Sequence, residues 1–273
     1  MIDPTARCPK WLIDRIGDSG GSISFYRYMD LVLNDPDNGF YSTGKLNIGK
    51  NGDFCTSPSL SNDFARLLAI QVVDWLLDLE KSGIDSELFS IIEIGPGEGT
   101  LSRDLMAAIS EIAPALINKI EFILVELNVG MRRRQEKVVN NLEGINCRWS
   151  SIEDLILRPV TGVVIANEVL DAFPVERLVF SDNKVFRQGV SLKKINDEYS
   201  LEFVDLKPTS KIIKFLKESN SLLKIEFPPK DICNRWVTEW HCDIPSWFGN
   251  LSKVLIDGAL LVVDDAMESK RYY

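Results

Sequence analysis

Three glycines separated by single residues, Gly95, Gly97 and Gly99, form the most distinctive pattern in the chain. Because glycine has no Cβ, such a run lets the backbone turn sharply and approach a ligand closely. A β-rich run, 89–94, precedes the glycines, and residues 100–109 follow with apolar side chains at helical spacing. Open α/β sheets bind ligands at the carboxyl ends of their strands. The pattern therefore predicts a ligand-binding loop between a strand and a helix.

The spacing of these glycines separates two classes of cofactor. A dinucleotide site favours G-x-G-x-x-G, and its third glycine would fall at position 100, which is Thr100. The observed G-x-G-x-G, with Pro96 inside it and Glu93 in the preceding strand, is typical of S-adenosylmethionine sites. That cofactor has no pyrophosphate and carries a sulfonium cation, which acidic groups suit. The spacing favours S-adenosylmethionine, and a nicotinamide cofactor is the alternative.

An acidic residue ends the next predicted strand. Residues 120–125 are apolar and are followed directly by Glu126. A carboxylate at that end of the sheet can accept hydrogen bonds from a ribose diol. The predicted cofactor-binding residues are Glu93, Gly95, Pro96, Gly97, Gly99 and Glu126.

A second polar motif follows the buried run 162–166 and contains Asn167, Glu168 and Asp171. If the segment is a helical turn, the two carboxylates share one face. Paired carboxylates match the planar donor fork of an arginine, so they could orient a guanidinium for methylation. Alternatively, Asn167 is the N-cap of a helix whose first turn carries the acids. Both roles can coexist, and we take the three residues as catalytic candidates.

The elements that must position these residues alternate along the chain. Residues 22–83 are expected to be mostly helical, with turns from 35 to 54. Strands separated by helices then indicate a parallel sheet covered on both faces. An insert before the last strand reads as a β-hairpin with a turn at 196–198. The expected strands of the sheet are 89–94, 120–125, 145–149, 162–166 and 259–263, and those of the hairpin are 185–190 and 199–204.

This order predicts an α/β fold made of four parts. Residues 1–84 form an N-terminal helical or cap region, and 85–176 form the Rossmann-like cofactor-binding core. Residues 177–228 form an inserted hairpin and helix subdomain, and 229–273 return to the core with its fifth strand.

Composition excludes several other classes of protein. The net charge of −9 argues against a protein that tracks nucleic acid, which needs a basic surface. The five cysteines include no Cys-x-x-Cys pair, so neither a zinc site nor a disulfide framework is expected. The single histidine, His241, is a poor basis for a hydrolase triad. With no apolar stretch of membrane-spanning length and no secretory signal, we expect a cytoplasmic protein without a metal requirement.

Taken together, the motifs resemble those of the MidA family of S-adenosylmethionine-dependent methyltransferases, which includes the mitochondrial complex I assembly arginine methyltransferases. The resemblance spans roughly Ser22 to the C-terminus. It is carried by Phe25, Tyr28-Met29, Pro36-Asp37-Asn38-Gly39-Phe40-Tyr41, Gly52-Asp53-Phe54-x-Thr56-Ser57-Pro58, Glu93-x-Gly95-Pro96-Gly97-x-Gly99, Val125-Glu126 and Asn167-Glu168-x-x-Asp171-Ala172-x-Pro174-Val175, where x is any residue.

This resemblance implies a class I methyltransferase fold with an added helical and hairpin subdomain. It implies a protein substrate, an arginine on a subunit of the respiratory NADH dehydrogenase. It also implies that Gly52, Asp53, Phe54 and Thr56 bind the substrate, from a loop over the cofactor cleft. By itself that segment reads only as a turn leading into a helix. An assembly factor that binds the cofactor without transferring a methyl group is the alternative.

The chain departs from the family pattern at several positions. Ser59 stands where an acid is common, Ala65 where glycine is usual, and Asp264-Asp265-Ala266 where Asp-Tyr-Gly is typical. The family fold closes with a sixth and a seventh strand, for which no sequence remains after Tyr273. We therefore expect a sheet that lacks its C-terminal strands, with its fifth strand at an open edge.

Overall fold

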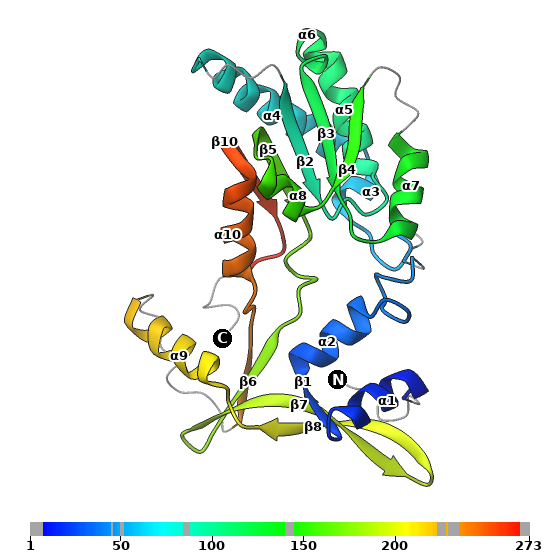
Figure 1. Ribbon diagram of the computed structural model, residues 1–273, viewed down its shortest axis with the longest axis vertical. Coiled ribbons are helices and arrows are strands. Elements are labelled where there is room, and N and C mark those ends of the chain that lie inside the picture. Colours follow the sequence, from blue (N-terminus) through cyan, green and yellow to red (C-terminus); the bar gives the residue numbers. More distant parts are fainter. Residues whose placement is uncertain are drawn as a thin grey trace. The chain divides into compact units, whose positions relative to one another are not determined.

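The computed structural model describes residues 8–44, 46–49, 52–83, 88–139, 145–222, 228 and 235–267. The chain forms two compact units (Figure 1). One, the glycine-loop unit, consists of Phe40–Ala172 and Asp243–Ala266. The other, the antiparallel unit, consists of Met1–Gly39, Phe173–Cys242 and Met267–Tyr273. The four-part division expected from the sequence stays a prediction.

A five-stranded parallel sheet is the centre of the glycine-loop unit, in the order β10-β5-β2-β3-β4. All five strands expected from the sequence are present, so the predicted α/β class with a parallel sheet is confirmed. The central position of β2 brings the end of the glycine-bearing strand between the ends of β3 and β5. The strands are β2 (Phe89–Ile94), β3 (Ile120–Val125), β4 (Asn146–Ser150), β5 (Val160–Asn167) and β10 (Leu255–Val263).

Helices cover both faces of this sheet (Figure 1). Side chains of α4 and α5 pack on one face, and those of α8 and α10 pack on the other. Successive side chains of a strand point to opposite faces of the sheet, and β2 is buried on both faces. Ile91 therefore packs in the core with α4 and α5, and Ile92 packs in the core with α8 and α10. The helices are α3 (Ser57–Leu60), α4 (Asp63–Lys81), α5 (Thr100–Ile112), α6 (Pro114–Ile117), α7 (Val129–Val139), α8 (Ile152–Leu157) and α10 (Ile244–Val254).

The antiparallel unit contains a second sheet, in the order β1-β7-β6-β9 with β8 paired to β7. The predicted hairpin is confirmed as β7 and β8, and its turn residues Asn196 and Asp197 have φ angles of 48° and 64°. These left-handed conformations suit a tight hairpin turn. The strands are β1 (Ser22–Ser24), β6 (Glu176–Ser181), β7 (Lys184–Ile195), β8 (Glu198–Leu206) and β9 (Trp236–Trp240), and the helices are α1 (Lys10–Asp18), α2 (Phe25–Asn34) and α9 (Ser210–Leu222).

The expectation that helical structure begins at Ser22 is wrong. Ile23 lies in β1 and pairs with Val190 of β7, a partner far along the chain. The helix α2 begins only at Phe25, where the Ser24 hydroxyl accepts a hydrogen bond from the backbone N–H of Arg27. A long-range strand pairing therefore overrides the local pattern at these three residues.

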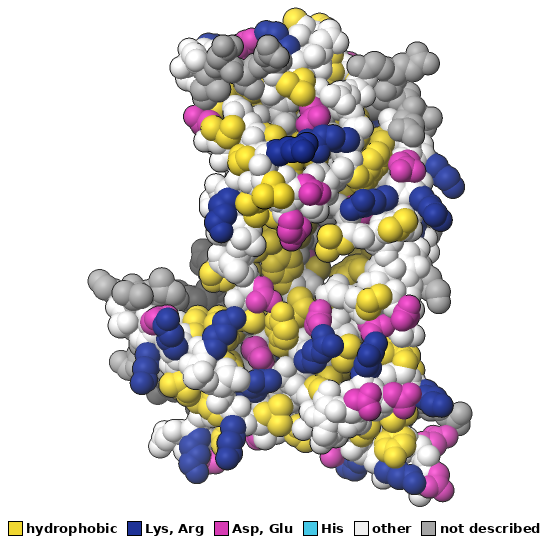
Figure 2. All heavy atoms as spheres, viewed as in Figure 1, with side chains coloured by type: hydrophobic (Ala, Val, Ile, Leu, Met, Phe, Trp, Pro, Cys, Tyr) yellow, Lys and Arg dark blue, Asp and Glu magenta, His cyan; other side chains and the backbone are white. Residues whose placement is uncertain are grey.

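Charged side chains of both signs are interspersed on the face drawn in Figure 2, and neither sign forms a continuous track there. Among the helices of the described ranges, none has the length and apolarity needed to cross a bilayer.

Candidate cofactor and acceptor site

The glycine loop joins β2 to α5 through three left-handed residues. Gly95, Gly97 and Gly99 have φ angles of 62°, 52° and 81°, which side chains with a Cβ rarely adopt. The loop is tied to the next strand, because the N–H of Gly95 donates to the carbonyl of Val125 at 3.1 Å. Within the loop, the N–H of Gly99 donates to the carbonyl of Pro96 at 2.7 Å. The predicted strand, turn and helix are confirmed.

Side chains from other segments lie close to two of the glycines. A Cβ on Gly97 would lie 2.7 Å from Cδ1 of Ile48, closer than real carbon contacts. A Cβ on Gly99 would lie 3.4 Å from Cγ of Gln135 in α7. The glycine loop is therefore enclosed by a preceding loop and by the helix after β3.

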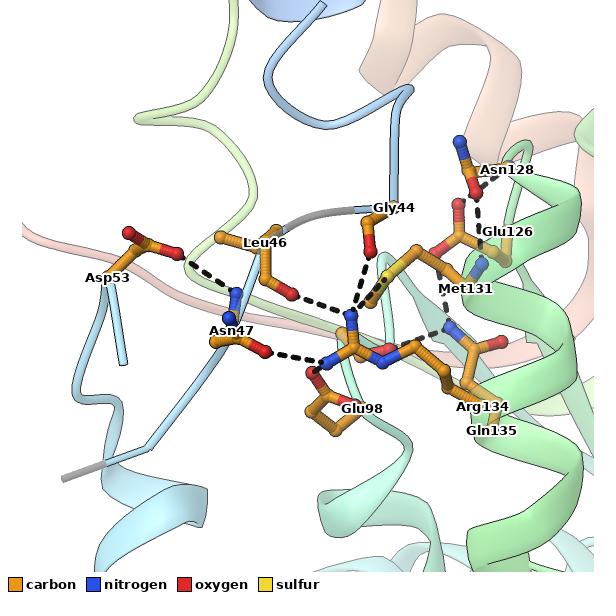
Figure 3. Close-up of polar contacts among 11 residues, drawn as sticks. Gly44, Leu46, Asn47, Asp53, Glu98, Glu126, Asn128, Met131, Arg134 and Gln135 are labelled. Carbon is orange, nitrogen blue, oxygen red and sulfur yellow. Dashed lines mark hydrogen bonds and ion pairs between the residues drawn. The ribbon is translucent and has the colours of Figure 1, made fainter. Parts of the chain in front are cut away.

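Glu126 lies directly after β3, beside the glycine loop (Figure 3). Its Oε1 accepts from the backbone N–H of Asn128 at 2.8 Å, and its Oε2 accepts from Nε2 of Gln135 at 3.1 Å. Partial burial raises the pKa of this carboxyl, while these hydrogen bonds oppose the rise. Since a carboxylate has about four lone-pair sites, acceptor capacity remains for a ribose diol.

The segment that encloses Gly97 is a loop closed by its own hydrogen bonds, which we call the strap (residues 46–49 and 52–54). The N–H of Gly49 donates to the carbonyl of Phe54 at 2.8 Å, and that of Asp53 to the carbonyl of Asn47 at 2.7 Å. A Cβ on Gly52 would lie 2.3 Å from the Asn47 carbonyl oxygen, so only glycine fits there. The predicted substrate-binding residues Gly52 and Asp53 thus shape the strap itself.

Arg134 of α7 fastens the strap to the glycine loop (Figure 3). Its Nη1 donates to the carbonyls of Gly44 and Leu46, at 3.1 and 2.6 Å. Its Nη2 pairs with the carboxylate of Glu98 in the glycine loop. Sequence reasoning missed this role, since nothing in the pattern of residues 131–135 distinguishes one arginine from its neighbours.

The other two predicted substrate-binding residues lie at the end of the strap. Phe54 is 45% exposed, and its ring meets that of Phe40 edge-to-face, with centroids 5.9 Å apart. Thr56 is the N-cap of α3, in a capping box that Ser59 completes. The Ser59 hydroxyl accepts a hydrogen bond from the backbone N–H of Thr56, the role that a glutamate side chain commonly has at this position of a capping box. The exposed ring of Phe54 can contact a substrate.

No helical turn follows β5, so the expected shared helical face of Glu168 and Asp171 is wrong, as is the helix-cap alternative for Asn167. Glu168 has a φ of 52°. The N–H groups of Val169 and Leu170 donate to Oδ2 of Asp264, at 3.1 and 2.7 Å. Because this carboxylate after β10 takes up both N–H groups, the segment forms an irregular turn instead.

The turn nevertheless keeps the acids near one another. Partial burial and the charge of Asp171 both raise the pKa of Glu168, and the carboxylates of Asp265 and Asp264 add to the rise. Burial and the charge of Asp171 also raise the pKa of Tyr41. An acidic group with a phenol beside it thus stands at the carboxyl end of β5.

Asn167 and Glu93 have polar atoms that are buried more deeply than the carboxylates of this turn. Oδ1 of Asn167 is buried and accepts no hydrogen bond within the described residues, so it is available to a ligand N–H. Glu93 is 5% exposed and accepts a hydrogen bond from the hydroxyl of Ser102 in α5. Burial raises the pKa of Glu93 to about 7. Its carboxyl therefore links β2 to α5, the two elements that the glycine loop joins.

The residues present fit S-adenosylmethionine. Three residues of the glycine loop lack a side chain, Glu126 offers a ribose acceptor and Asn167 has an unused buried oxygen. In the ranges that the structure describes, no group of three or more His, Cys, Asp or Glu residues could hold a metal ion.

Curated relatives of similar sequence are arginine methyltransferases by name. The chain is 35% identical over 111 residues to "Protein arginine methyltransferase NDUFAF7, mitochondrial" of Homo sapiens, a stretch that covers 40% of this chain and 24% of the relative. It is 27% identical over 215 residues to the Caenorhabditis elegans homologue, covering 71% and 48%. The matched stretches thus span less than half of these relatives.

A solved structure is similar over nearly the whole chain. The crystal structure of a protein from Burkholderia thailandensis with bound S-adenosyl-homocysteine superposes with a TM-score of 0.78 at 29% identity. The match covers 96% of this chain and 63% of that one. A second, native crystal structure of a protein from the same organism gives a TM-score of 0.74. The Rossmann-like methyltransferase fold is confirmed by this likeness.

A family model described as "Putative S-adenosyl-L-methionine-dependent methyltransferase" matches residues 67–273. The match includes the glycine loop, Glu126 and the motif after β5, and it covers most of the chain. This chain belongs to that family of S-adenosylmethionine-dependent methyltransferases.

Proposed function

We propose that the protein transfers a methyl group from S-adenosylmethionine to an arginine side chain of a protein substrate. The observation that carries the proposal is the placement of Glu126, whose carboxylate is held by Asn128 and Gln135 beside the glycine loop. Family membership and the S-adenosyl-homocysteine in the Burkholderia structure support the choice of cofactor.

Each part of the site has a task in this reaction. S-adenosylmethionine, when bound, supplies an electrophilic methyl group. The glycine loop would let the cofactor approach the protein backbone closely, and Glu126 would accept hydrogen bonds from the ribose hydroxyls. The strap covers Gly97 through Ile48, which helps to exclude water from the loop.

The acidic turn after β5 supports an arginine acceptor. Glu168 and Asp171 would bind a guanidinium and aim one of its nitrogens at the methyl group. Since burial and neighbouring acids raise the pKa of Glu168, its carboxylate is also a stronger base than an ordinary glutamate. It could take up the proton that the nitrogen loses. The names of the curated relatives support this class of acceptor.

The acceptor protein that we propose is a subunit of a respiratory NADH dehydrogenase, methylated in the cytoplasm. This rests on the resemblance of the motifs to the MidA family. Labelling tests it: the purified protein is incubated with radiolabelled S-adenosylmethionine and a lysate that lacks the endogenous enzyme. One labelled band of the size of such a subunit is the expected result, and label on other proteins alone would reject that acceptor.

Calorimetry tests the cofactor assignment. We expect S-adenosylhomocysteine to bind and Glu126→Ala to weaken its affinity about tenfold or more, since a charge-assisted hydrogen bond is lost. Unchanged affinity would reject the ribose role. Thermal protection by NADH in place of S-adenosylhomocysteine would instead favour an oxidoreductase. Binding without any labelled product, in the lysate experiment, would favour a cofactor-binding assembly factor.

A further inference from the structure

Gln135 is a fully buried polar residue that the site as described does not explain. It lies in α7 with 0% of its surface exposed. Its Nε2 donates to the carbonyl of Gly97 at 2.8 Å and to Oε2 of Glu126 at 3.1 Å. Its Oε1 accepts from Nε1 of Trp149 in β4 at 2.8 Å. The Gln135 side chain therefore links the glycine loop after β2, the residue after β3 and the strand β4.

Trp149 determines which way the amide of Gln135 points. An indole N–H can only donate, so it must face the amide oxygen. The amide nitrogen then necessarily faces Gly97 and Glu126, both of which present acceptors. If the amide were reversed, two acceptor oxygens would face Oε1 and two donors would face each other. The orientation of the amide is thus fixed by chemistry as well as by packing.

Gln135 also lies beside Gly99. A Cβ placed on Gly99 would lie 3.4 Å from Cγ of Gln135 and 3.5 Å from its Cα. The glycine at the start of α5 is thus packed against the helix that carries the glutamine. Because the amide is buried, a lost hydrogen bond here is not replaced by bulk water.

We propose that Gln135 is a positioning residue that holds the Glu126 carboxylate and the Gly97 carbonyl at the separation a bound nucleoside requires, with Trp149 setting its orientation. The inference rests on the proposed cofactor and concerns the same site. Gln135 acts through Glu126: its N–H holds one carboxylate oxygen and favours the ionised form, which leaves the carboxylate preorganised for the ribose.

A double-mutant cycle tests this role, with S-adenosylhomocysteine affinity measured by calorimetry on the full chain. Gln135→Met keeps the length of the side chain and removes the hydrogen bonds. We expect it to weaken affinity roughly tenfold to a hundredfold, the range for a hydrogen bond to a charged group. In a Glu126→Ala background the same substitution should weaken affinity by a clearly smaller factor, because the hydrogen bond to Glu126 is already lost and only the one to the Gly97 carbonyl remains.

Two further variants control for simple loss of folding. Trp149→Phe keeps a buried ring and removes only the indole N–H, so affinity should fall in the same direction by a smaller factor. Gln188→Met removes a buried glutamine amide from β7 of the antiparallel unit and should leave affinity unchanged. Thermal unfolding of every variant confirms that the folded protein is being measured.

The possible results separate the two proposals. If the unmodified protein binds S-adenosylhomocysteine and Gln135→Met weakens binding equally with and without Glu126, the positioning role is overturned and the cofactor assignment stands. Normal affinity of Gln135→Met overturns it as well. If the unmodified protein does not bind S-adenosylhomocysteine, the cofactor assignment fails and the positioning role fails with it. A clearly smaller effect of Gln135→Met in the Glu126→Ala background supports the inference.

Discussion

The backbone N–H of Glu168 donates to the carbonyl of Val263 at 2.7 Å, although Glu168 has a φ of 52°. A left-handed conformation is costly for a residue with a side chain, and it persists only where neighbours determine it. Here Val263 and Asp264, at the end of β10, hold the turn that carries the acceptor-side acids. The geometry of the predicted catalytic residues therefore depends on the strand next to them.

The first prediction concerns Asp264, whose replacement by alanine should destabilise the protein by about 1–3 kcal/mol, because two backbone N–H groups lose a charged acceptor. Urea unfolding measures the change. Asp264→Asn keeps an oxygen that can accept and should lose less. Equal losses for the two variants would show that charge alone, and not the pair of hydrogen bonds, holds the turn.

Replacing Glu168 with glutamine separates catalysis from cofactor binding. We expect the rate of transfer to an arginine substrate to fall at least tenfold, while S-adenosylhomocysteine affinity changes less than about threefold. Single-turnover assays and calorimetry give the two quantities. The rate of the unmodified protein should also fall as the pH drops through the raised pKa of Glu168. Parallel losses of rate and affinity would indicate a structural role instead.

Buried Glu93 makes stability depend on pH in a defined direction. Its pKa rises from 4.5 to about 7 on folding, so the folded state binds this proton more tightly than the unfolded state. Stability should therefore fall as the pH rises from about 4.5 to about 7, by up to about 3 kcal/mol, and then level off.

Glu93→Gln isolates this contribution. The unfolding free energy of the variant, measured with urea, should not fall between pH 4.5 and pH 7. The difference in unfolding free energy between the variant and the unmodified protein should therefore grow with pH across that window. A difference that stays constant from pH 5 to pH 8 would contradict the assignment. Ser102→Ala is a useful companion, because it removes the hydrogen bond that favours the carboxylate.

The strap should loosen when its fastening to α7 is removed. Arg134→Ala loses the donors to Gly44 and Leu46 and the ion pair with Glu98, so the strap should become a site of limited proteolysis. Arg134→Lys keeps the charge without the planar fork and should be intermediate. Arg148→Ala removes an ion pair between β4 and β3 and provides a matched control, expected to leave strap cleavage unchanged.

A small added side chain tests how closely the strap covers the glycine loop. Gly97→Ala places a methyl group where Cδ1 of Ile48 lies 2.7 Å away and forces a φ of 52° on alanine. We expect cofactor affinity and stability to fall together. Shortening the neighbour, in Gly97→Ala with Ile48→Ala, should recover part of the loss, since the clash is removed and the backbone strain remains. Full recovery would show that strain at Gly97 is negligible.

The parts predicted correctly from the sequence are those specified locally. The bounds of β2 and β3 follow from apolar runs that end in turn-forming or acidic residues, Gly95 and Glu126. The turn after β5 could not be predicted, because Leu170 is held by Asp264, 94 residues further along the chain. The same is true of β1 and of Arg134, whose partners Gly44 and Leu46 lie 90 and 88 residues away.

The edge strand β10 of the parallel sheet is synthesised well after the strand β5 with which it pairs. β2 to β5 can pair in the order of synthesis, whereas β10 follows the long segment Phe173–Cys242 that builds the antiparallel unit. Such a non-local pairing requires a long loop to close, so it forms more slowly than the pairing of strands that are near one another in the chain. The nucleoside side of the site, on β2 and β3, can thus mature during translation, while the turn at Glu168 waits for Val263 and Asp264. A nascent chain would acquire its capacity to hold the cofactor before its capacity to present an acceptor.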